Sequence, residues 1–349
     1  MKILVEMLHG LGDTVCALPM LKAVRNNYSE AEIVVITKGK ANIDIINASH
    51  IKIDKVIDWN IYGDSIIKTI KNIIYLRKQN FDIGINSANT PVKKARIFMK
   101  VMNCKRKIGL QHEFGKYIED YDDNLHFVDA NLLAIKNICD IEGMDKQPHL
   151  YPDKATLEFI ERRFRTFDDK PIVGVCIGNA DYSLRNRLLR TGKVFTRGWG
   201  IENMQQLLKK LLIQNYNIIL IGGKLEKRLI QQLDNAILKN KNIINFVNKT
   251  NIIQSIALVS KCDVVVGVDT GMQHIADAVG AKTISIFGPT NPKTHGAYSY
   301  KAVFVEAKEK CKYQYCYGSR LYVECNERKC LKNISVDEVM DKIILNLKR

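Results

Sequence analysis

Two short stretches of the sequence place a carboxylate and glycine directly after an apolar run. His9–Asp13 (HGLGD) follows KILVEML, and Asp269-Thr270-Gly271 follows DVVVGV. Unbroken apolar runs of this length are typical of parallel strands that are buried on both faces. Open α/β sheets bind their ligands at the carboxyl ends of such strands, so both stretches are predicted ligand sites. The simpler alternative is that each stretch only caps the helix that follows it.

The first of these carboxylates, Asp13, is a candidate general base. Two glycines make a tight turn before it, but a dinucleotide fingerprint would require Gly or Ala where this chain has Val15. No acidic residue closes the second strand, which ends at Thr37-Lys38, so a nicotinamide enzyme is disfavoured. A carboxylate in this place could accept the proton of a hydroxyl group that attacks carbon. The alternative role is that of a helix N-cap or first-turn acid.

The elements that would position these residues alternate between apolar runs and amphipathic segments. The strand candidates are KILVEML, EIVVIT, KVIDW, FDIGIN and RKIGL in the first half, and PIVGVCIG, NIILIGG, IINFV, DVVVGV and TISIF in the second. The alternation predicts an α/β fold of parallel sheets with helices on both faces. After Pro152 a helical stretch leads to Pro171, where the pattern restarts, so we expect two domains, residues 1–150 and 151–349, with a cleft between them. The final helix, SVDEVMDKIILNLK, begins with a capping box at Ser335 and is a candidate to pack back on the first domain.

Composition narrows the class of protein. The chain has 349 residues and a formal net charge of +16. No apolar run approaches the roughly 20 residues of a membrane span, and no signal-peptide pattern opens the chain, so a cytoplasmic protein is expected. The positive charge favours an acidic partner such as a nucleotide, a nucleic acid or an anionic membrane surface. Nucleic acid is disfavoured because the chain has no recognition motif and no basic patch interleaved with aromatic residues.

Three segments of the chain, two of which overlap the stretches above, occur in an order and at separations that are characteristic of one protein family. They are GDTVCALPMLKAV, RGWGIENMQQL and VGVDTGMQHIADAVGAKTISIFGPTNP. Together they resemble glycosyltransferase family 9, the ADP-heptose:lipopolysaccharide heptosyltransferases. The resemblance implies the GT-B fold, in which two Rossmann-like, doubly wound domains face each other across a cleft. It also implies an inverting transfer of heptose from ADP-heptose to an inner-core sugar of lipopolysaccharide, with no cofactor required for catalysis.

The resemblance also assigns roles to single residues. It implies that Asp13 deprotonates the acceptor hydroxyl and that the C-terminal domain binds the ADP-sugar donor. The implied donor-binding residues are Arg197 with Lys193 as its substitute, Glu226, Asp269, Thr270, Gly271 and His274. Cations and the N–H groups of a helix N-terminus would bind the diphosphate, while carboxylates would bind sugar and ribose hydroxyls. Glu226 could instead be an ordinary first-turn acid, and His274 a helix-packing histidine.

A basic stretch at residues 91–107 concentrates seven Lys and Arg residues in the N-terminal domain. The resemblance implies that this domain receives the acceptor, so Lys93, Lys94 and Arg96 are candidates to bind its phosphates and acidic sugars. Such a surface would suit a protein that is peripheral at the inner membrane. A solvated helix face carrying ordinary surface charge is the alternative.

Four cysteines, Cys311, Cys316, Cys325 and Cys330, form two C-x4-C pairs near the C-terminus. Four thiolates could hold a structural Zn or Fe ion tetrahedrally. A branch of the resembling family that glycosylates autotransporter proteins uses cysteines for a metal that supports an oligomer, although the spacing here departs from that branch. A protein O-heptosyltransferase is therefore one alternative function, and a non-catalytic nucleotide-sugar-binding protein is another.

Overall fold

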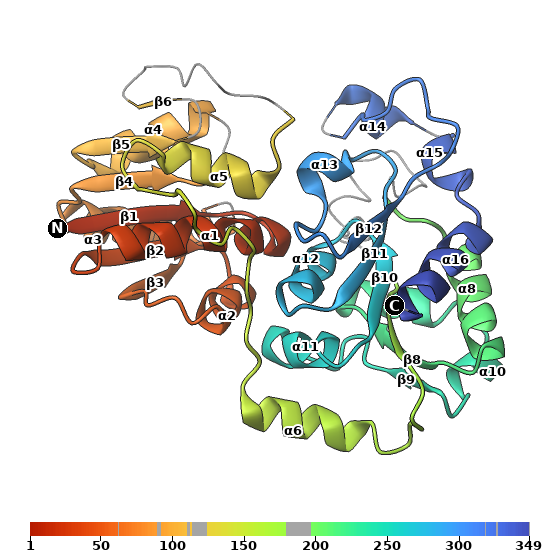
Figure 1. Cartoon of the computed structure of the whole chain (residues 1–349). Coiled ribbons are helices and arrows are strands. Elements are labelled where there is room, and N and C mark those ends of the chain that lie inside the picture. Colours follow the sequence, from red (N-terminus) through yellow and green to blue (C-terminus); the bar gives the residue numbers. More distant parts are fainter. Residues whose placement is uncertain are drawn as a thin grey trace. The chain divides into compact units, whose positions relative to one another are not determined.

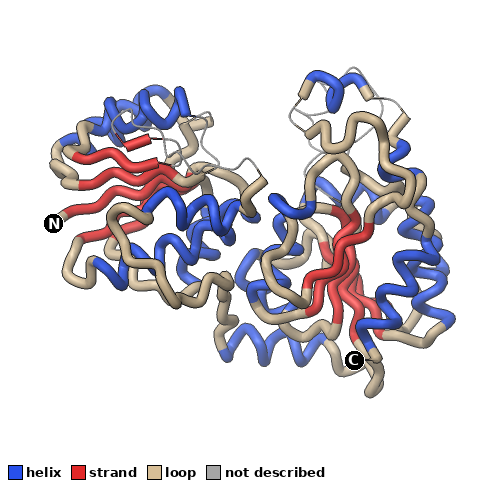
Figure 2. The backbone as a smooth tube through the Cα atoms, turned by 45° about the horizontal axis from the view of Figure 1, so that its top comes forward, coloured by secondary structure: helices blue, strands red, loops and turns tan. Residues whose placement is uncertain are grey.

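The computed structural model describes residues 1–61, 63–88, 92–109, 112–113, 124–178, 197–317, 319–325 and 327–348. The chain divides into two compact units, Met1–Leu150 and Tyr151–Arg349. Each unit contains one mainly parallel sheet with helices packed against it (Figure 1), and Figure 2 shows the two sheets as separate bundles of strands. The predicted α/β class with two doubly wound sheets is confirmed.

The first unit contains a sheet of order β3-β2-β1-β4-β5-β6. Its strands are β1 (Lys2–Met7), β2 (Glu32–Thr37), β3 (Lys55–Asp58), β4 (Ile83–Asn86), β5 (Arg106–Gly109) and β6 (His112–Glu113). The pairs are parallel except β5 with β6, which is antiparallel. The order of the strands reverses between β1 and β4, and this switch point is where open α/β sheets bind ligands.

Two groups of helices cover the first sheet. One group contains α1 (Leu11–Asn27), α2 (Lys40–Ala48) and α5 (Phe127–Ile135), in which α1 packs on the other two. The other contains α3 (Ile66–Arg77) and α4 (Val92–Met102), which pack on each other. Leu76 of α3 and Met99 of α4 share an apolar cluster with Leu4 and Ile36 of the sheet. Burial of these side chains attaches α3 and α4 to their face of the sheet.

The second unit contains a sheet of order β12-β11-β10-β7-β8-β9, in which all pairs are parallel. Its strands are β7 (Ile172–Cys176), β8 (Asn217–Ile221), β9 (Ile243–Asn245), β10 (Val264–Val268), β11 (Lys282–Ile286) and β12 (Ala302–Val305). Its helices are α6 (Lys154–Arg163), α8 (Ile201–Ile213), η2 (Lys224–Glu226), α9 (Lys227–Ile230), α10 (Asn235–Leu238), α11 (Ile252–Val259), α12 (Gly271–Ala278), α13 (Pro292–His295), α14 (Arg320–Glu324), α15 (Lys329–Lys332) and α16 (Val336–Leu347). The final helix, α16, packs on α8 and on the sheet of this unit.

The strands follow the sequence pattern closely. Every apolar run that predicts a strand contains one, and the described residues include two more, β6 and β12, at sheet edges. The predicted capping box is present, because Ser335 accepts the N–H of Glu338 and the Glu338 carboxylate accepts the N–H of Ser335. Within the described ranges no helix combines the length and the apolar character needed to cross a membrane.

The central strand β10 depends on a close approach to β7. Gly267 pairs with Cys176, and both strands are buried along nearly their whole length. A Cβ atom at position 267 would lie 2.6 Å from the Cβ and 3.0 Å from the carbonyl oxygen of Cys176. Backbone cannot withdraw as a flexible side chain could, so only glycine fits here without moving a strand.

We expect Gly267→Ala to lower the free energy of unfolding of the second unit by about 1–3 kcal/mol, the usual cost of overpacking a core. The chain offers one tryptophan reporter in each unit, since Trp59 lies in the first and Trp199 in the second, both buried. Urea unfolding followed by fluorescence in a Trp59→Phe background would report the second unit alone. In a Trp199→Phe background the transition of the first unit should not move, and an equal shift of both transitions would contradict the local explanation.

Candidate functional site

Asp269 is a buried carboxylate at the carboxyl end of β10. It is 6% exposed, and it follows the strand directly. The Thr290 hydroxyl, from the segment after β11, donates to Asp269 Oδ2 at 2.9 Å. Arg197 Nη1 lies 3.2 Å from the same oxygen. Burying a carboxylate is costly unless donors and a counter-charge compensate it, and here two separate segments supply them.

The start of α12, next to Asp269, presents polar groups that the described part of the protein leaves unused. Thr270 is the N-cap residue in an extended conformation, but its side chain makes no capping hydrogen bond. Its buried hydroxyl has no hydrogen-bond partner among the described residues, and the same is true of both amide atoms of the 2% exposed Gln273. Capping therefore does not explain the Asp-Thr-Gly sequence. N–H groups at a helix N-terminus favour an anion, so this arrangement can bind a phosphate group.

Arg197 is held in place by an aromatic cluster. Its guanidinium carbon lies 5.2 Å from the centroid of the Tyr317 ring. Tyr317 in turn makes edge contacts with His295 and Tyr322, with ring centroids 5.9 Å and 5.0 Å apart, and its N–H donates to the carbonyl of Pro289. Stacking on an aromatic face orients a guanidinium and leaves its in-plane N–H groups available for oxyanions.

Sequence reasoning singled out neither Thr290 nor Tyr317 as a site residue. A signal existed for Thr290, because Gly288-Pro289-Thr290 follows a strand that neighbours β10. For Tyr317 no local signal existed, since it lies in an irregular segment 48 positions from Asp269 and reaches Arg197 only through the fold. His274 lies half-buried in α12, and Lys193 lies outside the described residues.

Glu226 closes the short helix η2 after β8. Its Oε2 accepts the N–H of Gly223 at 2.8 Å, and the side chain is 8% exposed. Burial raises the pKa of this carboxyl, while the hydrogen bond from Gly223 opposes the rise. The interaction seen is that of a first-turn capping acid, one of the two roles that the sequence suggests. The predicted role toward ribose hydroxyls stays a prediction.

Asp13 lies at N3 of α1, just after β1. Its Oδ2 accepts the N–H of Gly10 at 2.9 Å, as a first-turn acid does. A second carboxylate lies at the end of the same strand: Glu6 is 2% exposed and accepts Asn86 Nδ2 at 3.0 Å and the N–H of Leu8 at 2.9 Å. Sequence reasoning overlooked Glu6, although a glutamate inside an apolar strand is itself a signal. Both carboxylates thus lie at the switch point between β1 and β4.

The candidate acceptor residues Lys93, Lys94 and Arg96 lie on α4, and their side chains lie outside the described set. The exposed Lys100 further along α4 shows that this helix does present a cation to solvent. The sequence prediction of an acceptor surface on α4 stays a prediction.

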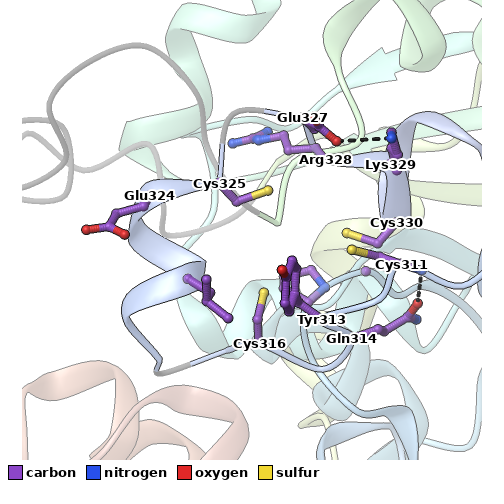
Figure 3. A pocket seen from close by; sticks show the side chains of 13 residues that line it. Cys311, Tyr313, Gln314, Cys316, Glu324, Cys325, Glu327, Arg328, Lys329 and Cys330 are labelled. Atoms are coloured by element: carbon purple, nitrogen blue, oxygen red, sulfur yellow. Dashed lines mark hydrogen bonds and ion pairs between the residues drawn. The ribbon is translucent and has the colours of Figure 1, made fainter.

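The four cysteines of the C-terminal segment line one pocket of about 440 Å³ (Figure 3). The sulfur atoms of Cys311 and Cys330 lie next to each other, and Cys316 and Cys325 reach the same space from other parts of the wall. Burial and the neighbouring thiols raise the pKa of Cys330 to about 11. However, the described residues contain no group of three or more His, Cys, Asp or Glu side chains placed to hold a metal ion. The structure therefore does not show the predicted four-thiolate centre, and a structural metal at these cysteines stays a prediction.

Sequence comparisons relate the chain to known heptosyltransferases. The family model of glycosyltransferase family 9 (heptosyltransferase) matches residues 70–322. Lipooligosaccharide heptosyltransferase 2 of Haemophilus influenzae is 27% identical over 169 residues, which are 47% of this chain and 45% of the relative. Lipopolysaccharide heptosyltransferase 2 of Escherichia coli is 23% identical over 45% of this chain and 43% of the relative. These two matches thus span less than half the length of each relative. Lipooligosaccharide heptosyltransferase 2 of Campylobacter jejuni is 25% identical over 83% of this chain and 82% of the relative.

Solved structures share the fold of this chain. The glycosyl transferase family 9 protein from Veillonella parvula matches with a TM-score of 0.80 and 17% identity, covering 99% of this chain and 97% of that one. ADP-heptose lps heptosyltransferase II of E. coli matches with a TM-score of 0.74 and 18% identity, over 100% and 99% of the two chains. The iron-containing dodecameric glycosyltransferase TibC from E. coli is less similar, with a TM-score of 0.56 and 11% identity over 100% of this chain and 76% of that one. The predicted GT-B fold class is confirmed.

We expect Thr290→Val to lower the free energy of unfolding of the second unit by about 1–3 kcal/mol, because the buried carboxylate of Asp269 loses a donor. Thr290→Ser keeps the hydroxyl and is the matched control, and it should stay closer to the parent. Urea unfolding in the Trp59→Phe background, with Trp199 as the reporter, would compare them. If the valine variant were as stable as the serine variant, the hydrogen bond to Asp269 would have no role in stability.

Proposed function

The chain belongs to glycosyltransferase family 9, the heptosyltransferase family, and we propose that it is an inverting glycosyltransferase that moves a heptose from ADP-heptose to an inner-core sugar of lipopolysaccharide. The observation that carries the proposal is the buried Asp269 beside Arg197 and the open start of α12. Relatives named as heptosyltransferases support it, as do solved structures of E. coli heptosyltransferase WaaC with ADP and with ADP-2-deoxy-2-fluoro heptose.

The leaving group of this reaction is a nucleoside diphosphate, so the donor site must stabilise negative charge that grows on the departing oxygen. Arg197 is suited to this task, because its guanidinium carries a permanent positive charge next to Asp269 and can bind oxyanions through several N–H groups. The N–H groups at the start of α12, with Thr270 and Gly271, would bind the other phosphate oxygens. Asp269 would accept hydrogen bonds from hydroxyls of the transferred sugar, Glu226 from those of the ribose, and His274 would lie near the phosphates.

The acceptor hydroxyl must lose a proton while its oxygen bonds to the anomeric carbon. In a single displacement the new C–O bond forms on the face opposite the breaking bond to phosphate, so the anomeric configuration inverts. We assign the proton to the Asp13 carboxylate. A carboxylate has several acceptor positions, so the hydrogen bond from Gly10 is compatible with this role.

The acceptor is anionic, and the first unit is proposed to bind it. Lys93, Lys94 and Arg96 of α4 would contact its phosphates and acidic sugars. We further propose that the protein works in the cytoplasm and associates peripherally with the inner membrane, where such an acceptor is exposed. Catalysis as proposed requires no metal, and a structural Zn or Fe ion at the four cysteines stays a prediction, because the described residues show no preformed group of metal ligands.

The proposed function is tested by incubating the purified full-length chain with ADP-heptose and a panel of truncated core acceptors. Mass spectrometry should show the addition of one heptose to one member of the panel, with release of ADP. Transfer to an autotransporter protein in place of every core acceptor would identify a protein O-heptosyltransferase. ADP-heptose binding without any transfer would identify a non-catalytic binding protein, and either result would overturn the proposal.

We expect Asp13→Asn to lower kcat by roughly 10²–10⁴, the usual contribution of a positioned general base. KM for the donor should hardly change, because Asp13 lies on the first unit and the donor residues lie on the second. Asparagine also caps helices well, so the melting temperature should stay close to that of the parent. If Asp13 only caps α1, turnover would remain within about threefold, which is about 0.7 kcal/mol of barrier.

A further inference from the structure

Helix α3 carries a wide apolar arc, and only part of this arc is buried. Leu76 is fully buried and Ile73 packs against the same apolar cluster, so the inner side is part of the core. Four isoleucines of the same helix are exposed: Ile66 by 78%, Ile67 by 67%, Ile70 by 50% and Ile74 by 50%. Single exposed apolar residues are ordinary, but the apolar arc of a helix is normally covered across its whole width. A contiguous patch of this kind marks an interaction surface.

The exposed isoleucines share one stripe. At 3.6 residues per turn, these four positions fall within an arc of roughly 100° around the helix axis. The neighbouring helix α4 adds Ile97, which is 65% exposed. Arg77 Nη1 donates to the carbonyl of Val101 at 2.9 Å and ties the two helices together. We call the surface of α3 formed by Ile66, Ile67, Ile70 and Ile74 the isoleucine patch.

The surroundings of the isoleucine patch are strongly cationic. Lys71, Arg77 and Lys78 are exposed at its margin. Residues 65–112, which include α3 and α4, contain eleven Lys and Arg residues and a single acidic residue, Asp82. Asp82 is already paired with Lys105 at 2.8 Å, and Asp64, which lies just before α3, is paired with Lys68 at 2.9 Å. The cations at the patch therefore face solvent with very little acidic charge to balance them.

This combination decides between possible occupants of the patch. A second copy of the chain would bring Lys71, Arg77 and Lys78 against like charges, which disfavours a symmetric pair. Nucleic acid would match the charge, but aliphatic isoleucines provide no stacking surface for bases. An anionic lipid surface matches both the apolar patch and the positive charge at its margin. Its acyl chains can contact the isoleucines, and its headgroups attract the cations.

We infer that α3 lies in the plane of an anionic membrane, with the isoleucine patch at the boundary between headgroups and acyl chains. Lys71, Arg77 and Lys78 then contact the lipid phosphates. The inference deepens the proposed function, since it rests on a membrane-bound acceptor and names the surface by which the first unit reaches it. Binding to lipid and transfer of sugar are nevertheless separate properties, and either can be observed without the other.

The test uses the full-length chain with phosphatidylcholine vesicles that contain or lack phosphatidylglycerol, in a flotation assay. The parent should bind the anionic vesicles and bind less as salt is added. Ile67→Gln/Ile70→Gln/Ile74→Gln should weaken that binding at least tenfold, because the apolar area buried in the interface is lost. Lys71→Gln/Lys78→Gln should remove most of the preference for anionic over neutral vesicles.

The second unit supplies the matched control. Ile213→Gln/Leu225→Gln/Leu345→Gln also removes three exposed apolar side chains, and this variant should bind vesicles as the parent does. All variants should keep the parent's melting temperature and its rate on a water-soluble truncated acceptor. The inference is overturned if the isoleucine variant binds vesicles normally, or if its only change is the loss of a dimer in solution. Failure of sugar transfer with normal vesicle binding would instead count against the proposed function alone.

Discussion

The second unit is organised around one buried carboxylate. Asp269 is almost fully removed from water, and such a group is tolerated only where hydrogen bonds and a counter-charge replace its hydration. Thr290 and Arg197 provide them, each from a different segment of the chain. The carboxyl ends of β10 and β11 and the segment before α8 must therefore meet at one point. The same constraint extends to the cysteine-containing segment, which delivers Tyr317 to the face of Arg197.

This arrangement holds charge in place before any substrate arrives. Arg197 is positioned by a carboxylate on one side and an aromatic ring on another, and the unused polar groups of Thr270 and Gln273 lie at the adjoining helix start. Electrostatic stabilisation is effective when donors need not reorganise during the reaction. Buried polar atoms that have no partner among the described residues are costly in a stable fold, so those of Thr270 and Gln273 are candidates to bind a ligand.

Positive charge serves a different purpose in the first unit. There the cations surround exposed isoleucines on α3 instead of a buried carboxylate. Coulombic attraction to an anionic surface is long-ranged and screened by salt, whereas burial of the isoleucines acts only on contact. The two contributions together would allow reversible association with a membrane, as the proposed transfer to a lipid-linked acceptor requires.

The sequence by itself determined the fold class, the strands and the strand ends that carry the candidate site. It could do so because fully buried parallel strands are continuous apolar runs, and because their carboxyl ends carry Asp, Thr and Gly within a few residues of the run. The sequence did not predict the edge strands β6 and β12, because short edge strands are only partly buried and show little hydrophobic pattern. The C-x4-C spacing predicted that four cysteines act together, and the fold does bring them to one pocket, but spacing along a chain does not say whether sulfur atoms converge on a point.

Only the tertiary structure decided which distant side chains meet. Tyr317 on Arg197, Thr290 on Asp269 and Asn86 on Glu6 are contacts between segments that share no local periodicity. The outward exposure of the isoleucines on α3 was likewise invisible in the sequence, where the segment is typical of an amphipathic helix whose apolar face is covered. Periodicity reports which residues share a face of an element, whereas the packing of elements decides whether that face is covered.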